Sequence, residues 1–160
     1  MHAPPGYVCP FCRVLGGVDN KYNTQNDVVW RDERTAALIA PNWWPENHGH
    51  VLVIPVVHVE NLYEIGERDL CAVSETTKRV AIALKEAYRC EGVSTRQHNE
   101  PAGNQEVWHL HVHVFPRYVG DELYQRHEEQ RWTTPAERAP YAEKLRAVLV
   151  PGASVPGTAG

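Results

Sequence analysis

The sequence lacks the features that mark secreted, membrane-bound or nucleic-acid-binding proteins. Its 160 residues include only four cysteines, too few for a disulfide scaffold of this size. No apolar run approaches the ~20 residues of a membrane span, and the start Met-His-Ala-Pro-Pro does not resemble a signal peptide. Basic residues are not in excess either, with 16 Lys and Arg against 20 Asp and Glu. We therefore expect a protein of the reducing cytoplasm with no nucleic-acid or membrane partner.

What the sequence does contain is enough apolar material for one domain. Hydrophobic residues make up 42% and charged residues 22% of the chain, which favours a folded core over disorder. Apolar spacing predicts helices over about 67–90 and 135–149. Short apolar or alternating runs predict strands at 28–31, 35–40, 50–55, 93–98 and 107–115, the first two joined by a hairpin turn.

The cysteines fall into two sets. Cys71 and Cys90 lie 19 residues apart in one predicted helix, about 28 Å, too far for a disulfide, so we expect two small buried side chains. Cys9 and Cys12 form a Cys-x-x-Cys pair, which fits either a redox pair or half of a metal site. A redox pair would need a helix that starts at the first cysteine, and Gly16-Gly17 argues against such a helix.

Histidine is the unusual residue, with nine in the chain and three of them in His109-Leu110-His111-Val112-His113. In a strand this alternation places the three imidazoles on one face. A purely structural role is the weaker alternative, because three buried polar rings carry a desolvation cost that a plain core avoids. Imidazole can serve as metal ligand, acid or base, or nucleophile. A catalytic metal on the three histidines is less favoured, since the residues after His113 offer no further ligand.

Three blocks of sequence together resemble the histidine-triad (HIT) family. They are His109 to Arg117, the run Gly49 to His58 with its Val-Ile-Pro, and Ala102 to Trp108. The resemblance covers roughly residues 9–118 and implies an α+β, HIT-like fold. Its antiparallel sheet would have about five strands, with one long helix and a C-terminal helix. We expect a flexible segment 1–8, a HIT domain 9–118, an extension with a helix over 119–150 and a disordered tail 151–160.

The resemblance implies an enzyme that acts on the α-phosphate of nucleotide conjugates. Dinucleoside polyphosphates and nucleoside phosphoramidates are typical substrates of the family, and the released monophosphate is expected to be AMP. His111 would be the nucleophile and form a nucleotidyl-histidine intermediate, with its Nδ1 bonded to a main-chain carbonyl. His113 would assist beside the phosphate, His50 would support the site and His98 would lie nearby. The family also implies a homodimer.

Phosphate contacts are expected from neutral groups, because the chain is net acidic. The main-chain amides of Gly103 to Gln105 are one source, and the side chain of Gln97 or Asn99 is another. Family members often have Ser or Thr where this chain has Glu106, so we assign the contact with the leaving group to Gln105. Glu106 is either a proton donor or a solvated charge.

On the nucleoside side the resemblance implies contacts with ribose and base. Asn42 lies thirteen residues before Pro55, the spacing of the ribose-binding residue. Phe11, Val14 and Trp43 occupy positions of the apolar base pocket, with ordinary core packing as the alternative. The segment from Tyr118 to Leu149 is expected to set substrate specificity.

Some bacterial-type members of the family carry a structural zinc ion, and all of its ligands are present. They would be Cys9, Cys12, His58 and His109, a closed Cys₂His₂ set with no open position for water. Two other classes of function stay open at this point. One is a nucleotide-binding regulatory protein with vestigial catalysis, and the other is a metal-dependent hydrolase that uses the triad histidines.

Overall fold

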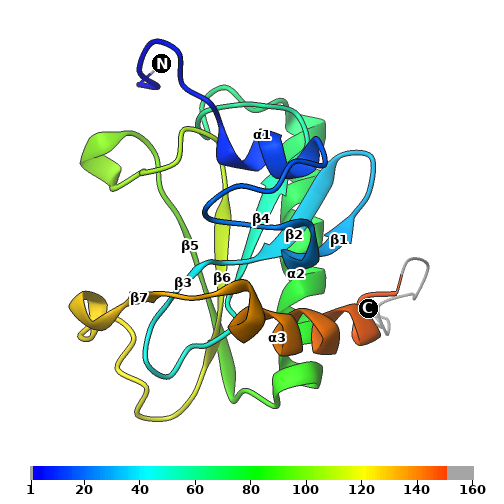
Figure 1. Cartoon of the computed structure of the whole chain (residues 1–160), viewed down its shortest axis with the longest axis vertical. Coiled ribbons are helices and arrows are strands. Elements are labelled where there is room, and N and C mark those ends of the chain that lie inside the picture. The colour runs from blue at the N-terminus through cyan, green and yellow to red at the C-terminus, as the bar shows by residue number, and fades with distance from the viewer. Residues whose placement is uncertain (1, 151–160) are drawn as a thin grey trace.

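A five-stranded antiparallel sheet forms the centre of the computed structural model, which describes residues 2–150 (Figure 1). The strands follow the order β1-β2-β4-β6-β5. Their bounds are Val28–Arg31 (β1), Thr35–Ile39 (β2), Val51–Pro55 (β4), Gly92–Gln97 (β5) and Val112–Arg117 (β6). A separate two-stranded sheet joins β3 (Asn42–Trp43) to β7 (Arg131–Trp132).

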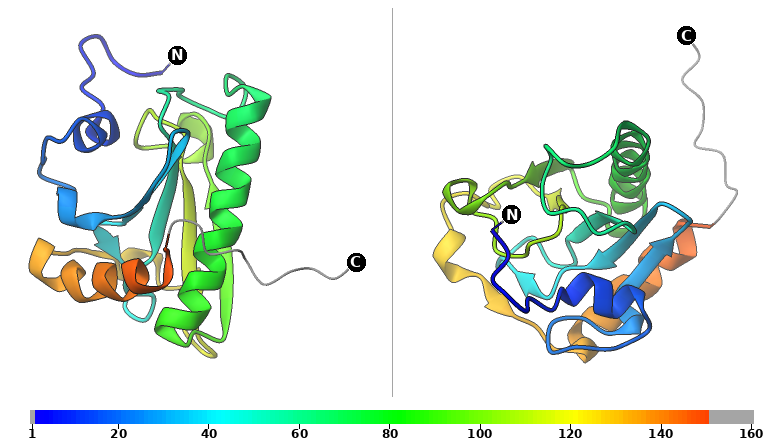
Figure 2. Two further views of the ribbon diagram at one scale, coloured as in Figure 1. Left: turned by 90° about the vertical axis from the view of Figure 1, so that its right-hand side faces the viewer. Right: turned by 90° about the horizontal axis from the view of Figure 1, so that it is seen from above.

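Both faces of the central sheet are covered, which explains why β2 and β4 are apolar without alternation. Every residue of these two strands is buried. On one face Ala37 and Val53 pack under the long helix α2 (Glu67–Tyr88). On the other face Leu38 and Leu52 pack against the short helix α1 (Pro10–Leu15). Figure 2 shows the sheet between α2 and the N-terminal segment.

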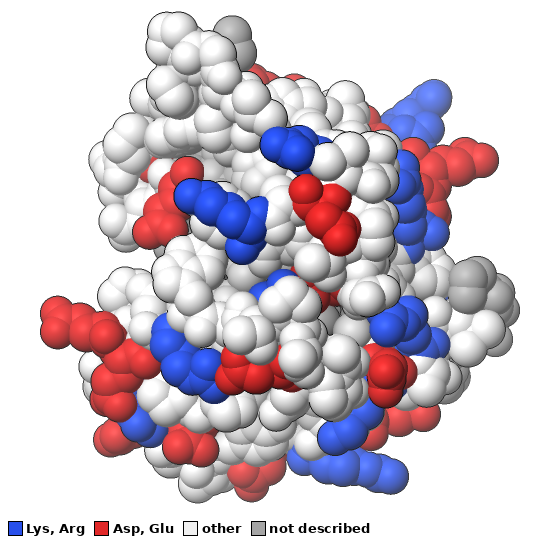
Figure 3. All heavy atoms as spheres, in the orientation of Figure 1, with Lys and Arg blue, Asp and Glu red and all other residues white. Residues whose placement is uncertain are grey.

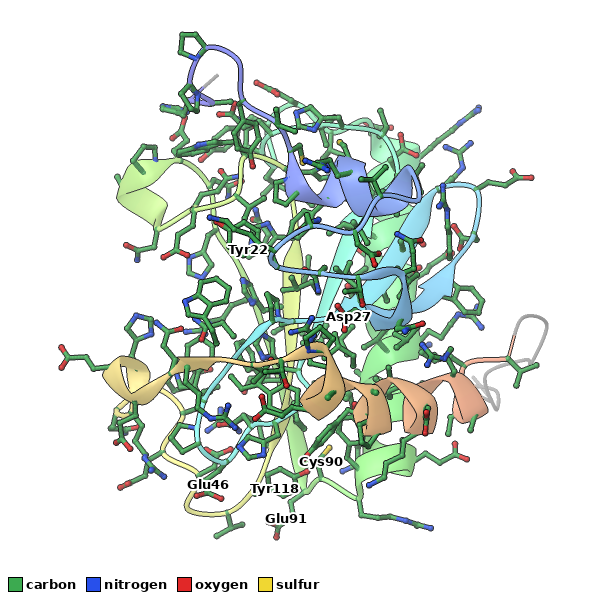
Figure 4. All side chains as sticks on the ribbon, viewed as in Figure 1. Tyr22, Asp27, Glu46, Cys90, Glu91 and Tyr118 are labelled. Carbon is green, nitrogen blue, oxygen red and sulfur yellow. The ribbon has the colours of Figure 1, made fainter. Side chains whose placement is uncertain are left out.

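The residues after β6 wrap back across the molecule. They form β7 and the C-terminal helix α3 (Pro135–Val148), which begins with a capping box between Thr134 and Glu137. A buried ion pair fixes α3 in place, with the Arg138 guanidinium 2.7 and 2.9 Å from the two carboxylate oxygens of Asp27. Figure 4 shows Asp27 beside the first turns of α3. The extension is therefore packed onto the N-terminal half of the chain.

The predicted fold class is confirmed, and so are the long helix, the C-terminal helix and the five strands. Four local predictions were wrong. A helix does start after Cys9, since Cys9 is its N-cap and Gly16 its C-cap. The last strand begins at 112 instead of 107, because the Leu110 amide donates to the Val59 carbonyl outside the sheet.

That strand also continues through Pro116, which we expected to end it. Pro116 lies beyond the part of β6 that pairs with β4, so its missing N–H group costs no ladder bond there. Its carbonyl accepts from the Asn47 side chain at 2.8 Å. The pairing of β3 with β7 was not predicted at all.

Cys90 is buried as expected, but Cys71 is exposed on the outer face of α2. The predicted disorder of 151–160 lies outside the described residues. Within residues 2–150 no helix combines the length and apolar character that a membrane crossing requires. Acidic and basic side chains are intermixed on the face shown in Figure 3, without a continuous area of one sign.

Candidate active site and metal centre

The triad histidines lie on the face of the sheet that α1 covers. On β6, His113 stands opposite Arg96 of β5 and Leu52 of β4. The rings of His111 and His113 are 5.0 Å apart. The Phe11 ring meets the His111 ring edge-on at 5.4 Å. Because Phe11 belongs to α1, this helix forms one wall beside His111.

His111 is held in one tautomer by the main chain. Its Nδ1 lies 2.7 Å from the carbonyl oxygen of His109. A carbonyl can only accept, so Nδ1 carries the proton and Nε2 keeps its lone pair. Burial lowers the pKa of His111 to about 4, with a smaller lowering by His98. At neutral pH the ring is therefore uncharged, which is the form that a nitrogen nucleophile requires.

His113 is backed by a second buried imidazole, His50. The two rings stack at 5.5 Å, and His113 Nδ1 lies 3.4 Å from His50 Nε2. Burial is the main cause that lowers the pKa of His50 to about 3, and the charge of Arg96 lowers it further. The pKa of His113 is also held well below its ordinary value, mainly by burial. Both rings are therefore uncharged at neutral pH, and the His50 ring packs against the His113 ring.

A fourth imidazole completes this face. His98 follows the last residue of β5, and its ring lies 5.9 Å from the His113 ring. Its Nδ1 donates to the Gly103 carbonyl at 2.6 Å, so Nε2 is the ring nitrogen left for other partners. His98, which we expected only in the neighbourhood, is therefore a direct neighbour of the triad.

The structure does not bring Gln97 or Asn99 to the histidines. Gln97 pairs with Val112, whose side chain packs in the core under α2, so alternation turns Gln97 to that opposite face. The Gln97 and Asn99 side chains hydrogen-bond to each other, and Asn99 also accepts from the Leu62 amide. These two residues fasten the end of β5, and His98 between them faces the site.

The loop before the triad uses its polar groups internally. The main-chain N–H groups of Gly103, Asn104 and Gln105 donate to carbonyls of Glu100 and Pro101 within the loop. The Gln105 amide nitrogen donates to the Glu60 and Val107 carbonyls, and its oxygen accepts from the Glu100 amide. We expected Gly103 and Gln105 to contact the substrate, but in the structure they hold this loop together. Glu106 is exposed.

Asn42 has an unsatisfied acceptor. Its amide nitrogen donates to the Gln130 side chain at 2.8 Å, while its Oδ1 is buried with no hydrogen-bond partner among the described residues. On β7, Trp132 stands opposite Asn42 and is exposed, and its ring contacts Tyr22 at 5.3 Å. Figure 4 shows Tyr22 on the front of the molecule between α1 and β7. An aromatic surface therefore adjoins Asn42.

The three residues expected in a base pocket are not all together. Phe11 and Val14 belong to the cluster beneath α1, where Val14 is fully buried. Trp43 belongs to the other core, where its ring contacts Tyr141 of α3 at 4.9 Å and its N–H donates to the Ala40 carbonyl. In this structure Trp43 is a core residue.

Four side chains form a cluster next to this site that could hold a metal ion. Cys9, Cys12, His58 and His109 each offer one ligand atom, and all four atoms lie within 4.8 Å of one another. Three nitrogen-to-sulfur contacts within this group measure 3.3–3.6 Å, and the two Nδ1 atoms are 3.2 Å apart. A tetrahedral zinc ion would separate its ligands by about 3.3 Å (N to N) and about 3.5 Å (N to S).

The surroundings of the cluster also suit a metal. His109 Nε2 lies 3.0 Å from the Pro55 carbonyl, so it carries the proton and Nδ1 presents a bare lone pair to the cluster. The Cys12 amide lies 3.5 Å from the Cys9 sulfur. The donor set and its spacing therefore fit zinc. Of the triad, only His109 belongs to the cluster.

Sequence reasoning missed Arg96 as a neighbour of the triad and Trp44 as a neighbour of His50. Arg96 lies across from His113, and the Trp44 ring contacts the His50 ring at 5.7 Å. The alternation of Ser94, Arg96 and His98 along β5 was a usable signal, but it required the pairing of β5 with β6.

Comparison with known proteins agrees with this geometry. The HIT domain model matches residues 21–120. An uncharacterised HIT-like protein of Methanocaldococcus jannaschii is 33% identical over 114 residues, which is 71% of this chain and 82% of that protein. The crystal structure of a Zn-bound histidine triad family protein from Mycobacterium smegmatis superposes with a TM-score of 0.72 at 27% identity, over 88% of this chain and 91% of that one. Adenylylsulfatase HINT3 of Arabidopsis thaliana is 25% identical over 72% of this chain and 55% of its own length.

Proposed function

Because this chain belongs to the HIT family, we propose that it is a nucleotidyl hydrolase or transferase that cleaves nucleotide conjugates at the α-phosphate. The observation that carries the proposal is the hydrogen bond from His111 Nδ1 to the His109 carbonyl, which leaves a neutral Nε2 as nucleophile. AMP is the expected product. One relative is named an adenylylsulfatase, which supports an adenosine conjugate as substrate.

The reaction would proceed in two displacements. In the first, the Nε2 lone pair of His111 forms a bond to the α-phosphorus while the bond to the leaving group breaks, and its electron pair departs with that group. In the second, a water oxygen attacks the same phosphorus, the N–P bond breaks and its electron pair returns to Nε2. The water proton leaves to solvent or to the departed group. One water is consumed and a nucleoside monophosphate is released.

The other residues of the site would position the substrate. His113 and His98 lie beside His111, and each can hydrogen-bond a phosphate oxygen through Nε2 when that atom is protonated. The unsatisfied Oδ1 of Asn42 is suited to accept from a ribose hydroxyl. Phe11 would contact the nucleoside from α1. Gln105 would act by holding the loop that orients His98.

We propose that the Cys₂His₂ cluster binds one zinc ion with a structural role. The four ligands close the coordination sphere, so the ion would supply folding energy and leave the reaction to His111. It would fasten α1, and with it Phe11, beside the triad. In this assignment the zinc ion takes no part in the reaction.

We further propose a homodimer in a reducing cytoplasm. β5 is an edge strand with no partner on its outer side among the described residues, and such an edge can extend a sheet into a second copy. None of the four cysteines forms a disulfide, which is consistent with a reducing compartment.

The test is a comparison of the parent protein with His111→Ala and His111→Asn. We expect both variants to lose AMP release from adenylated substrates by about 10³-fold or more while they keep nucleotide binding and bound zinc. Mass spectrometry after a denaturing quench at neutral or alkaline pH, where the N–P bond survives, should detect an adenylyl adduct on His111 of the parent. Loss of zinc with the substitution would instead support a catalytic metal, and a parent that binds but never releases AMP would support a regulatory protein.

A further inference from the structure

Arg96 carries a positive charge and has no acidic partner in the part of the chain that the structure describes. It is half-buried on β5, and no ion pair or hydrogen bond to its guanidinium occurs among residues 2–150. The guanidinium lies over three rings, 4.6 Å from Phe115, 5.1 Å from Trp44 and 5.9 Å from Tyr124. Stacking holds the group in place but does not use its N–H donors.

A neighbouring arginine, Arg117, has the contacts of a residue with a structural role. Arg117, on the adjacent strand, binds the Asp121 carboxylate through two nitrogens at 2.7 Å and the Ser94 hydroxyl at 2.8 Å. Arg96 lies on the same face of the sheet without any such contact. An arginine that is fixed by rings and left without an acceptor is suited to bind an anion that is not part of the chain.

Two buried donors here, one on Trp44 and one on Arg96 itself, lack acceptors among the described residues. The indole N–H of Trp44 and the Nε–H of Arg96 are both buried without a hydrogen-bond partner, and so is His50 Nδ1. Trp44 contacts both other side chains, with its ring 5.1 Å from Arg96 and 5.7 Å from His50. Indole and guanidinium nitrogens can only donate, so the missing partner must be an acceptor. Unsatisfied buried donors are costly, which favours a bound oxyanion.

The position of these groups relates them to the nucleophile. His113 stands opposite Arg96 in the ladder, and cross-strand neighbours on one face have Cβ atoms about 5 Å apart. His113 in turn adjoins His111. In an in-line displacement the leaving group lies on the side of the α-phosphorus opposite His111 Nε2, and a second tetrahedral centre joined by one bridging oxygen is about 3 Å from that phosphorus. Since His113 lies between His111 and Arg96, a leaving group that extends over His113 would point toward the Arg96 guanidinium.

We propose that Arg96 binds a second tetrahedral oxyanion joined to the α-phosphate of the substrate, either a β-phosphate or a sulfate. The preferred substrates are then nucleotide conjugates with an anionic leaving group, such as polyphosphates or adenylyl sulfate. Arg96 would not strengthen the binding of conjugates whose leaving group is an uncharged amine. The inference rests on the proposed function, because it uses the position of the α-phosphate at His111.

The experiment measures binding, so that it does not depend on turnover. Dissociation constants of AMP, ADP and adenylyl sulfate are determined by calorimetry without added divalent cations, using a His111→Asn background to prevent cleavage. In that background we expect ADP or adenylyl sulfate to bind at least tenfold more tightly than AMP. Adding Arg96→Met should weaken the anionic conjugates about 10- to 100-fold and AMP less than threefold. Arg96→Lys should restore part of the difference.

Arg79→Met is the matched control. Arg79 also lies over an indole ring, 4.6 Å from Trp30, but on α2 at the opposite face of the sheet. It should change none of the three constants. Thermal unfolding of each variant checks that the fold is retained. If Arg96→Met weakens the binding of ADP alone, the group that Arg96 binds is a phosphate. If it weakens the binding of adenylyl sulfate alone, that group is a sulfate.

Two results would overturn the inference. One is an equal loss of affinity for AMP and the anionic conjugates in Arg96→Met, which means a structural role. The other is an unchanged preference for the anionic conjugates. Failure of the proposed function looks different, since a parent protein that releases no AMP can still show the Arg96-dependent preference in binding.

Discussion

On β5 the side chains alternate, so Arg96 and His98 face the triad while Gln97 faces α2. From sequence we placed an amide, Gln97 or Asn99, at the phosphate, because that residue type is usual in the family. The pairing of β5 with β6 instead places Arg96 and His98 on the face of the triad, and a shift of one residue would reverse which side chains share that face. Single residues of a site depend on register, which no local pattern in this chain fixes.

This alternation predicts a difference between adjacent substitutions. His98→Ala should lower kcat/KM for AMP release by about 10²-fold, since it removes a polar group beside the phosphate. His98→Asn should recover part of the loss. Gln97→Ala, one position earlier, should have a much smaller effect. Steady-state kinetics on the three purified variants checks this, and a larger loss in Gln97→Ala than in His98→Ala would restore the assignment made from sequence.

Among the elements, those with a clear internal pattern were predicted well. β1 matches its predicted bounds, and α2 has its predicted start with an end two residues earlier than expected. α1 has only six residues, too few for a helical period to show. β3 and β7 exist only by pairing residues about ninety positions apart, at Asn42 and Trp132. Alternation in His109 to Val112 predicted a longer β6, but hydrogen bonding to the sheet starts only at Val112.

The attachment of α3 gives a prediction about stability. The Arg138 and Asp27 side chains are each 2% exposed. Arg138→Met would leave the carboxylate buried without its partner, which should cost about 3–5 kcal/mol of unfolding free energy. Denaturant unfolding followed by fluorescence measures this.

A second variant and a control complete that test. Asp27→Asn combined with Arg138→Met should recover part of the loss, because no buried charge remains. Arg126→Gln breaks an exposed pair with Glu129 and should have a far smaller effect, since solvent screens that pair. An Arg138→Met protein as stable as the parent would contradict the structural role of the pair.

At the scale of the whole molecule, the metal cluster joins three distant parts of the chain. Its ligands come from α1, from the segment after β4 and from the start of the triad. The sequence resemblance supplied all four residues, and the structure brings them together at ligand distances. What the sequence could not supply was the placement of α1 over the sheet, which depends on packing against Leu38 and Leu52.

This arrangement predicts that metal removal destabilises the protein. Elemental analysis should find one zinc ion per chain. Cys12→Ser, or dialysis against a strong chelator, should lower Tm by roughly 5–12 °C, the equivalent of about 3 kcal/mol in a chain of this size. Cys71→Ser, at an exposed cysteine on α2, is the control and should leave Tm unchanged. A metal-free protein with the Tm of the parent would rule out the zinc site.

His109 has three polar groups, and each has a separate task. Nδ1 points into the metal cluster, Nε2 is bonded to Pro55, and the carbonyl orients His111. The two sites are therefore coupled through one residue. A relative that lacks the cysteines must keep this backbone in position by other packing, or the residue in the place of His111, the proposed nucleophile, loses its proton arrangement. Structures of relatives without the cysteines would show what else can hold the carbonyl that corresponds to that of His109.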